Sequence, residues 1–335
     1  MERTGKELLI ASRQFARENR LRSHFVLWST LALTIGTLCI AASPTLPVYF
    51  CIAASVAGGL LIVRLFTIFH DYMHGAILKD SPAAFVVMYF YGMLTLSPPA
   101  IWKHNHDHHH KHNSRHFGAE IGSFPVWTTE AYAAAPWYRK LLYRFIRSPW
   151  TIVLGYFTNF WGKKVIHEFM VDPKNNFRCL IAAVIHVGTG ALIATYSWQA
   201  FVLAFAIPML IACALGTYLF YAQHNFPGVV RKEGHEWDHV WAALNSSSCM
   251  EMNPVMHWFT GNIGFHHIHH LNAKIPFYRL PEAMSEIVEL QTPVTTSLRP
   301  KDIMACMRLK LWDPQKERLV SWKEAAASRL AATVA

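Results

Sequence analysis

Charged residues are scarce in this sequence. Of its 335 residues only 16% are Asp, Glu, Lys or Arg, whereas 53% are hydrophobic and 13% are aromatic. That balance is too apolar for an ordinary soluble domain. A recognisable nucleic-acid-binding motif is also lacking. The formal net charge of +10 therefore does not indicate a nucleic-acid partner, because in a membrane protein an excess of Lys and Arg marks cytoplasmic segments.

Cysteine is present but not in a pattern that suggests chemistry. None of the six cysteines forms a C-x-x-C pair, and several lie in apolar runs. We interpret them as buried thiols, which excludes a disulfide framework or a thiolate metal site. Internal repeats and low-complexity linkers are missing too. The simplest division is a single membrane-embedded domain, residues 1–335.

Several long stretches carry no formal charge. Phe25 to Ser43 and Cys179 to Gln223 contain no Asp, Glu, Lys or Arg, and Pro47 to Phe69 contains only Arg64. A bilayer core takes about 20 apolar residues as a helix. We therefore predict an all-α integral membrane protein with four transmembrane helices in two hairpins. The predicted spans are approximately 25–43, 47–69, 179–197 and 200–222.

Two further apolar stretches are predicted to be interfacial or re-entrant helices, at 83–100 and 148–162. Basic residues crowd the segment before the first span and the region 103–178, whereas the two hairpin turns have none. The positive-inside rule then places both termini and the long middle region in the cytoplasm. A cleavable signal pattern is not evident, so the first span is predicted to stay as an anchor.

Histidine, in contrast, is abundant and clustered. His70 and His74 are four residues apart and share one face of a helix at the end of the second span. The stretch WKHNHDHHHKHN, from Trp102 to Asn113, fits an H-x-x-H-H box in one register only, since position 105 is Asn. The later stretch GFHHIHH also fits in one register only, since position 263 is Ile.

These boxes indicate a metal centre. Three boxes supply eight imidazoles, and the histidine of Gln223-His224-Asn225 adds a ninth, which is enough for two metals. The predicted ligands are His70, His74, His106, His109, His110, His224, His266, His269 and His270. All must meet on one side of the membrane, so the segment from Ser81 to Trp102 cannot cross it, and we expect a break at Ser97-Pro98-Pro99.

Other polar residues near the boxes have two possible roles. Acceptors that fix the imidazole tautomer are expected around such ligands. The candidates are Asp71, Asp107, Asn225, Glu236, Asp238 and Asn262, and for each of them surface solvation is an equal alternative. A separate stripe of histidines is predicted to make hydrogen bonds or contact phosphate rather than bind metal: His104, His108, His112 and His116. We expect His267 to face away from the metal, His186 to be a hydrogen-bonded interior residue, and Arg64 to reach the interface.

The set HDYMH, HDHHH and HHIHH, with QHN before the last, resembles the membrane fatty acid desaturase family. The segments SFPVWTTEAYAAAPWYRKLLYRFIRSPW, HEWDHVWAALNSSS and WFTGNIGFHHIHHLNAKIPFYRL resemble its Δ12 and bacterial acyl-lipid branch. The resemblance implies two non-haem Fe ions on the nine histidines and O2-dependent formation of a cis double bond in a lipid-linked acyl chain. It also implies the cytoplasmic side of a bacterial inner (plasma) membrane.

The electrons must come from elsewhere, because the sequence has neither the HPGG of a fused cytochrome b5 nor cysteines for an iron–sulfur cluster. We expect a separate ferredoxin or cytochrome b5, docking on basic residues such as Lys163, Lys164, Arg144 or Arg147. The alternative is that these residues set topology or touch anionic lipid.

Three rival functions remain open at this point. A hydroxylase or acetylenase would use the same boxes, because both begin with the same hydrogen abstraction. A zinc-dependent membrane hydrolase fits poorly with nine histidines and no ligating carboxylate. A metal transporter would place its polar ligands near the bilayer midplane rather than at span ends. Double-bond position, chain length, the carrier of the acyl group and the oligomeric state are not readable from the sequence.

Overall fold

The computed structural model describes residues 3–115, 121–232 and 236–334. Within these ranges four helices are long and apolar enough to cross a membrane. They are α2 (Arg20–Ala41), α3 (Val48–His74), α10 (Arg178–Tyr196), and a continuous helix made of α11 (Trp198–Phe201), the π-helix η3 (Val202–Ala206) and α12 (Ile207–Ala222). The protein is thus a mostly helical membrane protein, as its composition indicates.

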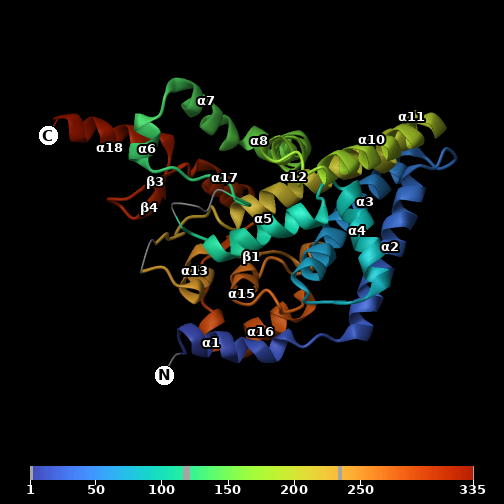
Figure 1. The fold of residues 1–335 in the computed structure, drawn as a ribbon, viewed down its shortest axis with the longest axis horizontal. Coiled ribbons are helices and arrows are strands. Elements are labelled where there is room, and N and C mark those ends of the chain that lie inside the picture. Colours follow the sequence, from blue (N-terminus) through green and yellow to red (C-terminus); the bar gives the residue numbers. More distant parts are fainter. Residues whose placement is uncertain (1–2, 116–120, 233–235, 335) are drawn as a thin grey trace.

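The four helices form two hairpins around a central helix (Figure 1). α2 and α12 both pack along α3, and α10 packs on α4 (Pro82–Leu94). α3 is the most buried of the four, whereas most of the apolar residues of α2 and α10 are exposed on the surface of the protein. The turns of both hairpins lie together at one end, where the Gln199 amide nitrogen is 3.5 Å from the Ser43 carbonyl oxygen. The histidine-bearing segments lie toward the opposite end.

The helix ends differ from the hydropathy limits. α3 continues to His74, five residues beyond the predicted end at 69, and Gly75 ends it with φ +64°. α2 begins at Arg20, where the Asn19 side chain accepts the Arg22 amide. The difference arises because hydropathy marks the lipid-immersed part of a helix, whereas caps decide where it ends. The extra turns of α3 carry the first histidine pair away from the lipid.

The apolar segment 83–100 does not cross the membrane as one straight helix. α4 ends at Leu94, α5 (Pro99–His112) begins at Pro99, and the two helices meet at 86°. The break coincides with Ser97-Pro98-Pro99, because two successive prolines lack the N–H groups that would continue the helix. This corner directs α5 across the end of α3.

The segment predicted as an interfacial helix at 148–162 is divided and longer. It forms α8 (Pro149–Val153) and a π-helix, η2 (Tyr156–His167), which packs between α10 and α12. Before it lies α7 (Trp137–Ile146), which hydropathy does not predict because it is short and three of its ten residues are Arg or Lys. α7 leaves one apolar side exposed.

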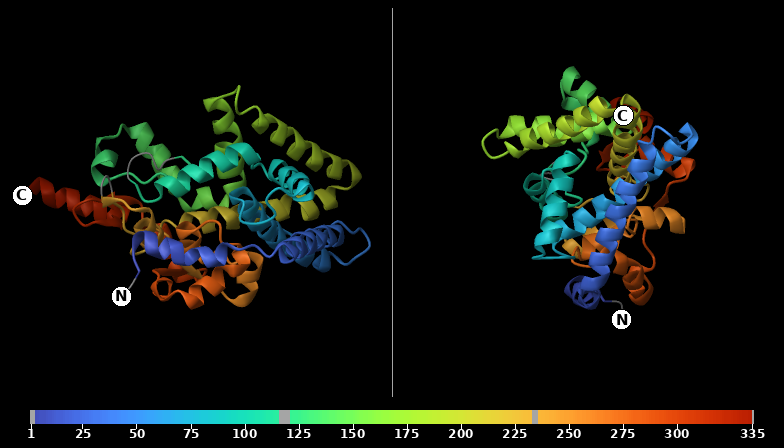
Figure 2. Two further views of the ribbon diagram at one scale, coloured as in Figure 1. Left: turned by 60° about the horizontal axis from the view of Figure 1, so that its bottom comes forward. Right: turned by 90° about the vertical axis from the view of Figure 1, so that its right-hand side faces the viewer.

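The remaining elements form a cap at the histidine end of the spans. α1 (Gly5–Ser12) packs against α13 (His239–Ser246), which places the N-terminal segment beside the C-terminal third of the chain (Figure 2). Two small sheets tie the loops of the cap: β1 (Cys249–Glu251) pairs in parallel with β2 (Thr295–Ser297), and β3 (Leu311–Asp313) pairs antiparallel with β4 (Arg318–Val320). The other helices of the cap are η1 (Arg13–Ala16), α6 (Thr129–Ala134), α9 (Glu168–Val171), α14 (Pro254–Phe259), α15 (His266–Leu271), η5 (Phe277–Arg279), α16 (Leu280–Glu286), η6 (Val288–Leu290), α17 (Pro300–Arg308) and α18 (Trp322–Val334).

Arg64 is a correction to the sequence-based expectation. It does not extend to the interface but is only 7% exposed. Its guanidinium donates to the Thr30 hydroxyl at 3.2 Å and to the Trp258 carbonyl, and it lies 4.1 Å from the centre of the Trp258 ring. A buried guanidinium is tolerated here because carbonyl, hydroxyl and aromatic partners replace water. Arg64 thereby joins α2, α3 and α14.

Candidate metal centre

Four separate segments bring the box histidines to one place. The last turn of α3 carries His70 and His74, and the second half of α5 carries the three histidines of the second box. His224 lies two residues beyond the end of α12. The third box forms the short helix α15, whose start is fixed by a bridge between Phe265 and Cys249 of β1. Helical spacing of three and four residues places the ligating members of each box on one face.

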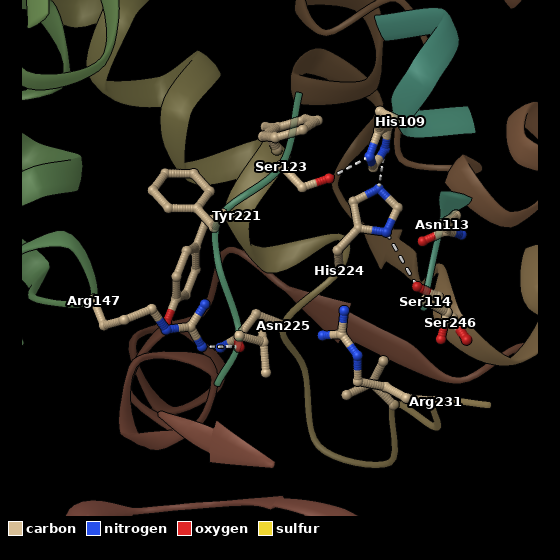
Figure 3. Close-up of a pocket in the computed structure, with 14 residues that line it drawn as sticks. His109, Asn113, Ser114, Ser123, Arg147, Tyr221, His224, Asn225, Arg231 and Ser246 are labelled. Carbon is tan, nitrogen blue, oxygen red and sulfur yellow. Dashed lines mark hydrogen bonds between the residues drawn. The ribbon is translucent and has the colours of Figure 1, made fainter. Parts of the chain in front are cut away.

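Four of these histidines form one group, defined as the four-histidine group: His109, His224, His266 and His270. The Nε2 atom of His224 is 3.0 Å from that of His109 and 2.9 Å from that of His266. The Nε2 atoms of His266 and His270 are 3.1 Å apart. Behind this group, Nδ1 of His109 is hydrogen-bonded to the Ser123 hydroxyl at 2.7 Å (Figure 3).

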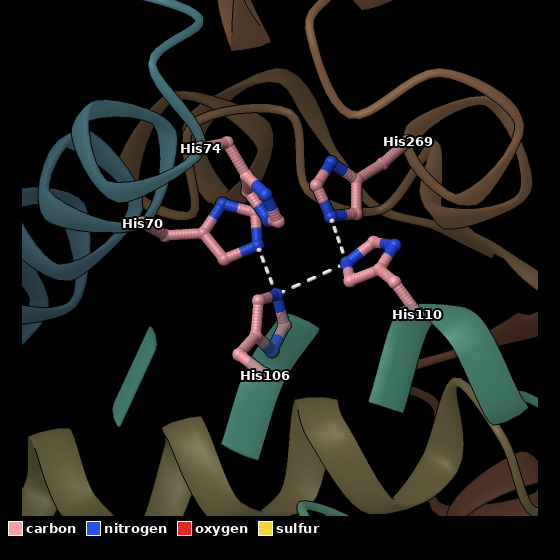
Figure 4. A group of neighbouring side chains, drawn as sticks. All are labelled: His70, His74, His106, His110 and His269. Carbon is pink, nitrogen blue, oxygen red and sulfur yellow. Dashed lines mark hydrogen bonds between the residues drawn. The ribbon is translucent and has the colours of Figure 1, made fainter. Parts of the chain in front are cut away.

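The other five form the five-histidine group: His70, His74, His106, His110 and His269. Their imidazoles point toward a common centre (Figure 4). Successive Nε2 atoms are about equally spaced, at 3.0 Å from His70 to His106, 3.1 Å from His106 to His110 and 3.0 Å from His110 to His269. The Nε2 atom of His74 is buried and has no hydrogen-bond partner among the described residues.

The two groups are neighbours. The rings of His110 and His270, one from each group, are stacked with their centroids 4.2 Å apart. All nine histidines named from the sequence therefore lie in two adjoining groups, and within the described residues no other set of three or more metal-ligating side chains is gathered in this way. Seven of the nine are buried, and His110 and His224 are partly buried.

Hydrogen bonds on the far side of the rings fix which nitrogen carries the proton. Nδ1 of His224 donates to the Ser246 carbonyl at 3.1 Å, and Nδ1 of His70 donates to Asp71 at 3.0 Å. A neutral imidazole has one N–H, so both of these rings present an Nε2 lone pair to the centre of their group. Imidazole lone pairs converging in a buried hollow repel one another unless a cation lies among them. This arrangement fits bound metal.

The donor sets suit a transition metal. Each group offers only imidazole nitrogens, four in one group and five in the other, and within each group these atoms lie within 4.8 Å of one another. Imidazole is a suitable ligand for iron, copper, zinc and nickel.

The electrostatics of the pocket keep the imidazoles neutral. Burial, reinforced by neighbouring imidazoles, lowers the pKa of His266, His269 and His270 well below the ordinary histidine value. Burial also lowers the pKa of His224 to about 4. Metal ions compete with protons for the same lone pairs. At neutral pH these side chains are therefore in the form that binds metal.

Among the six polar candidates for supporting roles, the structure places only Asp71 against a predicted ligand. Its Oδ1 accepts Nδ1–H of His70 at 3.0 Å, and its Oδ2 accepts the Phe277 amide at 2.6 Å. It is 1% exposed. Asp71 thus connects the first box to the segment that follows the third.

The other five candidates lie elsewhere. Asp107 pairs with Lys103 on the outer side of α5, and Asp238 caps α13 by accepting two of its first amides. Asn225 contacts Arg147 and the Cys306 carbonyl, not an imidazole. Asn262 donates to the Phe277 carbonyl, and Glu236 is exposed. Within the described residues none of the five hydrogen-bonds to an imidazole. Asp107, Glu236 and Asp238 fit the alternative of surface solvation, whereas Asn225 is buried among other partners.

Two supporting groups come from segments that the sequence analysis did not connect with the boxes. The Ser123 hydroxyl reaches His109 because Gly122 turns the chain closely over α5, with φ +71°. A Cβ at Gly122 would lie 2.1 Å from the Asn105 carbonyl oxygen. The other group is the backbone carbonyl of Ser246, and a carbonyl has no sequence signature.

The additional histidines stay outside the two groups. His104 is exposed, and the rings of His108 and His112 stack on each other at 3.9 Å. His267 bonds the Leu290 carbonyl, as expected for a side chain that faces away from the centre. His186 bonds the Tyr156 hydroxyl and the Leu94 carbonyl, each at 2.6 Å, inside the protein. His116 lies outside the described residues.

Aromatic side chains close the membrane side of the five-histidine group. The Trp102 ring stacks on His106 with centroids 4.4 Å apart and meets Phe69 edge-on at 5.1 Å. Phe66 contacts both of these rings. The imidazoles are therefore bounded by an apolar layer between them and the transmembrane helices, which keeps water away from that side.

Comparison with known proteins gives two matches. Residues 45–295 match the family model described as fatty acid desaturase. The chain is also 31% identical, over 278 residues, to a fatty acid desaturase of Bacillus subtilis (strain 168). That alignment covers 81% of this chain and 77% of the relative. The match to the family model spans all nine box histidines, from His70 to His270.

Proposed function

This chain belongs to the fatty acid desaturase family, and from that premise we propose that it introduces a cis double bond into a lipid-linked acyl chain. The proposed reaction consumes O2, two electrons and two protons, and it yields the alkene and two waters. The observation that carries the proposal is the pair of adjoining histidine groups, formed by nine imidazoles without a carboxylate among them.

Two non-haem Fe ions are the metals we propose for these groups. Iron would supply the oxidising power that no side chain has, namely the power to remove hydrogen from an unactivated alkyl chain with O2. The five-histidine group would hold one ion and the four-histidine group the other. The all-imidazole donor sets are compatible with iron, because imidazole is a suitable ligand for it.

The protein's own contribution is orientation and exclusion of water. Asp71, the Ser123 hydroxyl and the Ser246 carbonyl hold three of the rings from behind, so that each presents a fixed nitrogen. Trp102, Phe69 and Phe66 separate the imidazoles from the spans. An acyl chain approaching from the transmembrane helices would meet this apolar layer first. It would pass from lipid to apolar side chains without exposing its apolar surface to water.

We propose that the electrons come from a separate ferredoxin or cytochrome b5. Of the four basic residues suggested from the sequence as a docking surface, the structure leaves only Arg144 exposed. Arg147 is 1% exposed, the Lys164 ammonium lies 3.9 Å over the Phe160 ring, and Lys163 donates to the Ser123 carbonyl at 2.6 Å. The burial of Arg147 argues against docking on that residue, whereas the exposure of Arg144 supports a docking surface that includes it.

The orientation in the membrane is also a proposal. The N-terminal helix, the C-terminal sheets and both histidine groups lie at the end of the spans away from the two hairpin turns (Figure 1). Since basic residues are concentrated at that end, the positive-inside rule supports a cytoplasmic position for both termini and the metal centre. We propose a bacterial inner membrane as the location.

The deciding experiment is the fatty acid profile of a bacterial host that expresses the chain. His269→Ala serves as the inactive control, since His269 is a buried member of the five-histidine group. Gas chromatography with derivatives that locate double bonds should show a new unsaturated acid that the control lacks. The purified protein should contain about two irons per chain, as expected for two imidazole sites.

Other products would redirect the assignment. A new hydroxy acid would identify a hydroxylase on the same framework. Absence of any new product, together with absence of iron in the purified protein, would contradict the proposal.

A further inference from the structure

A pocket of about 510 Å³ lies between the α7–α8 corner, α17 and the start of α18. Its volume is within the range of small-molecule sites. Five of the side chains that line it are cationic, and among the described residues none of its lining is acidic. We call it the cationic pocket, defined by Arg144, Arg147, Arg308, Lys310 and Lys323.

The charge of the cationic pocket is not balanced from within the protein. In the described part of the chain no ion pair involves any of its five cations. Two of them are buried, Arg147 at 1% exposure and Lys310 at 6%. Buried charges are normally paired, because removing them from water is costly. This concentration of charge is what a site for an anion requires.

The two buried cations, Arg147 and Lys310, have only neutral hydrogen-bond partners. The Arg147 guanidinium donates through Nη2 to Asn225 and to the Leu309 carbonyl (Figure 3). Its Nε and Nη1 are buried and have no hydrogen-bond partner among the described residues. The Lys310 ammonium donates to the Arg147 carbonyl. Burial, and then the Arg147 charge, lower the pKa of Lys310 to about 8.

The surface beside the pocket has the character of a membrane interface. α7 exposes five large apolar side chains at helical spacing: Trp137, Tyr138, Leu141, Leu142 and Phe145. The exposed side chains of Trp150 and Val153 continue this surface toward η2 and the spans, and Met304 is exposed at the rim of the pocket. Aromatic and aliphatic residues beside arginine and lysine are typical of helices that lie at the level of lipid headgroups.

We propose that the cationic pocket binds the phosphate group of a membrane glycerophospholipid whose acyl chains lie along the apolar side of α7. Guanidinium and ammonium groups bind phosphate oxygens by charge-assisted hydrogen bonds. The Ser148 and Ser321 residues at the pocket wall add further polar groups. The proposal stands on the pocket itself and does not depend on which reaction the histidine centre performs.

The cationic pocket lies close to the metal centre. Arg147 lines both the cationic pocket and a second, smaller cavity that reaches His109 and His224. Its partner Asn225 follows His224 directly in the chain. A phospholipid bound in the cationic pocket would therefore contact Arg147, whose partner Asn225 is the chain neighbour of His224.

The test uses the full chain purified in a neutral detergent. Isothermal titration with monomeric dihexanoyl phosphatidylglycerol is compared with dihexanoyl phosphatidylcholine and with inorganic phosphate. The test variant is Arg308→Gln with Lys323→Gln, two exposed side chains of the pocket. The matched control is Arg139→Gln with Lys301→Gln, two exposed cations outside it, of which Lys301 shares α17 with Arg308.

We expect phosphatidylglycerol to bind more tightly than either other ligand. Removing the two pocket cations should weaken binding about 25-fold, since each basic side chain near an anionic headgroup contributes about a factor of five. The control should change binding less than twofold. Equal melting temperatures of the two double variants show that lost binding does not come from unfolding.

Four results would overturn the proposal. The first is that the wild type does not bind phosphatidylglycerol, and the second is that both double variants lose the same binding affinity. The third is that inorganic phosphate binds as tightly as the lipid, which would indicate a soluble phosphate compound. The fourth is that the pocket variant binds lipid normally but accepts electrons more slowly, which would assign the pocket to an acidic protein partner.

Discussion

Asp71 offers a direct test of how the protein holds its metal centre. The carboxylate is 1% exposed and makes two hydrogen bonds, one to Nδ1 of His70 at 3.0 Å and one to the Phe277 amide at 2.6 Å. Asn in its place has one acceptor oxygen and an NH2 group. The Asn NH2 group must then face either the His70 Nδ1–H or the Phe277 amide. Either His70 loses the acceptor that fixes its tautomer, or the side chain that holds His70 loses its own anchor at Phe277.

The size of the effect follows from that loss. Removing a hydrogen-bond partner of a metal-ligating histidine typically lowers metal affinity 10–100-fold, or about 1.4–2.7 kcal/mol. We expect Asp71→Asn to show a decrease in this range. Asp107→Asn is the matched control, because Asp107 also sits inside a histidine box but pairs only with Lys103 on an exposed side of α5. It should change affinity less than twofold, since such exposed pairs contribute about 0.5 kcal/mol.

The measurement is competition for iron against a chelator of graded concentration, followed by metal analysis of the protein. Melting curves of the metal-free variants, recorded alongside, report any general loosening of the fold. Retention of metal by Asp71→Asn within twofold of the wild type would refute the role assigned to the carboxylate. Equal weakening by Asp107→Asn would show that any charge near the boxes has the same effect, which is contrary to the geometry.

Three further predictions follow from the same contacts. Gly122→Ala should destabilise the protein by at least about 1–2 kcal/mol and reduce its iron content, because φ is +71° and the Cβ meets a carbonyl. Gly188→Ala is the control: its Cβ meets nothing and it lies inside α10, so the melting temperature should not fall. His104→Ala should leave the iron content unchanged while His106→Ala lowers it, as measured by metal analysis; equal effects would contradict the two groups. Arg64→Met should lower stability by about 1–3 kcal/mol, because it leaves buried acceptors without their donor, and an unchanged melting temperature would refute this.

The comparison of sequence and structure shows which features are local. Eight of the nine histidines in the two groups were named from spacing, because helical geometry decides which members of an H-x-x-x-H or H-x-x-H-H box share a face. His224 was named from its place just beyond the fourth span. The spans were found from hydropathy, and the break at Ser97-Pro98-Pro99 from the missing amides of proline. Each of these depends on residues within one or two helical turns.

The features that were missed depend on distant segments. Asp71 and Asp107 have the same position relative to their boxes in the sequence, yet only Asp71 meets an imidazole, because α3 is packed on the segment at Phe277 and α5 turns its other side outward. Arg64 was expected at the interface, and it is buried because α14 provides a carbonyl from nearly 200 residues later. The basic residues proposed for docking could not be sorted into exposed and buried before α7 and α17 were placed.

The sequence by itself therefore determined the membrane class of the protein, the identity of its candidate ligands and its family, since each is encoded in composition or short-range periodicity. Tertiary structure alone decided how the nine imidazoles divide between the four-histidine group and the five-histidine group. It also decided which side chains and carbonyls hydrogen-bond to the imidazoles from behind. It also decided that five cations share one pocket beside α7. The physical reason is that these depend on packing between segments far apart in the chain, where the position of a side chain is set by its neighbours and not by its own sequence.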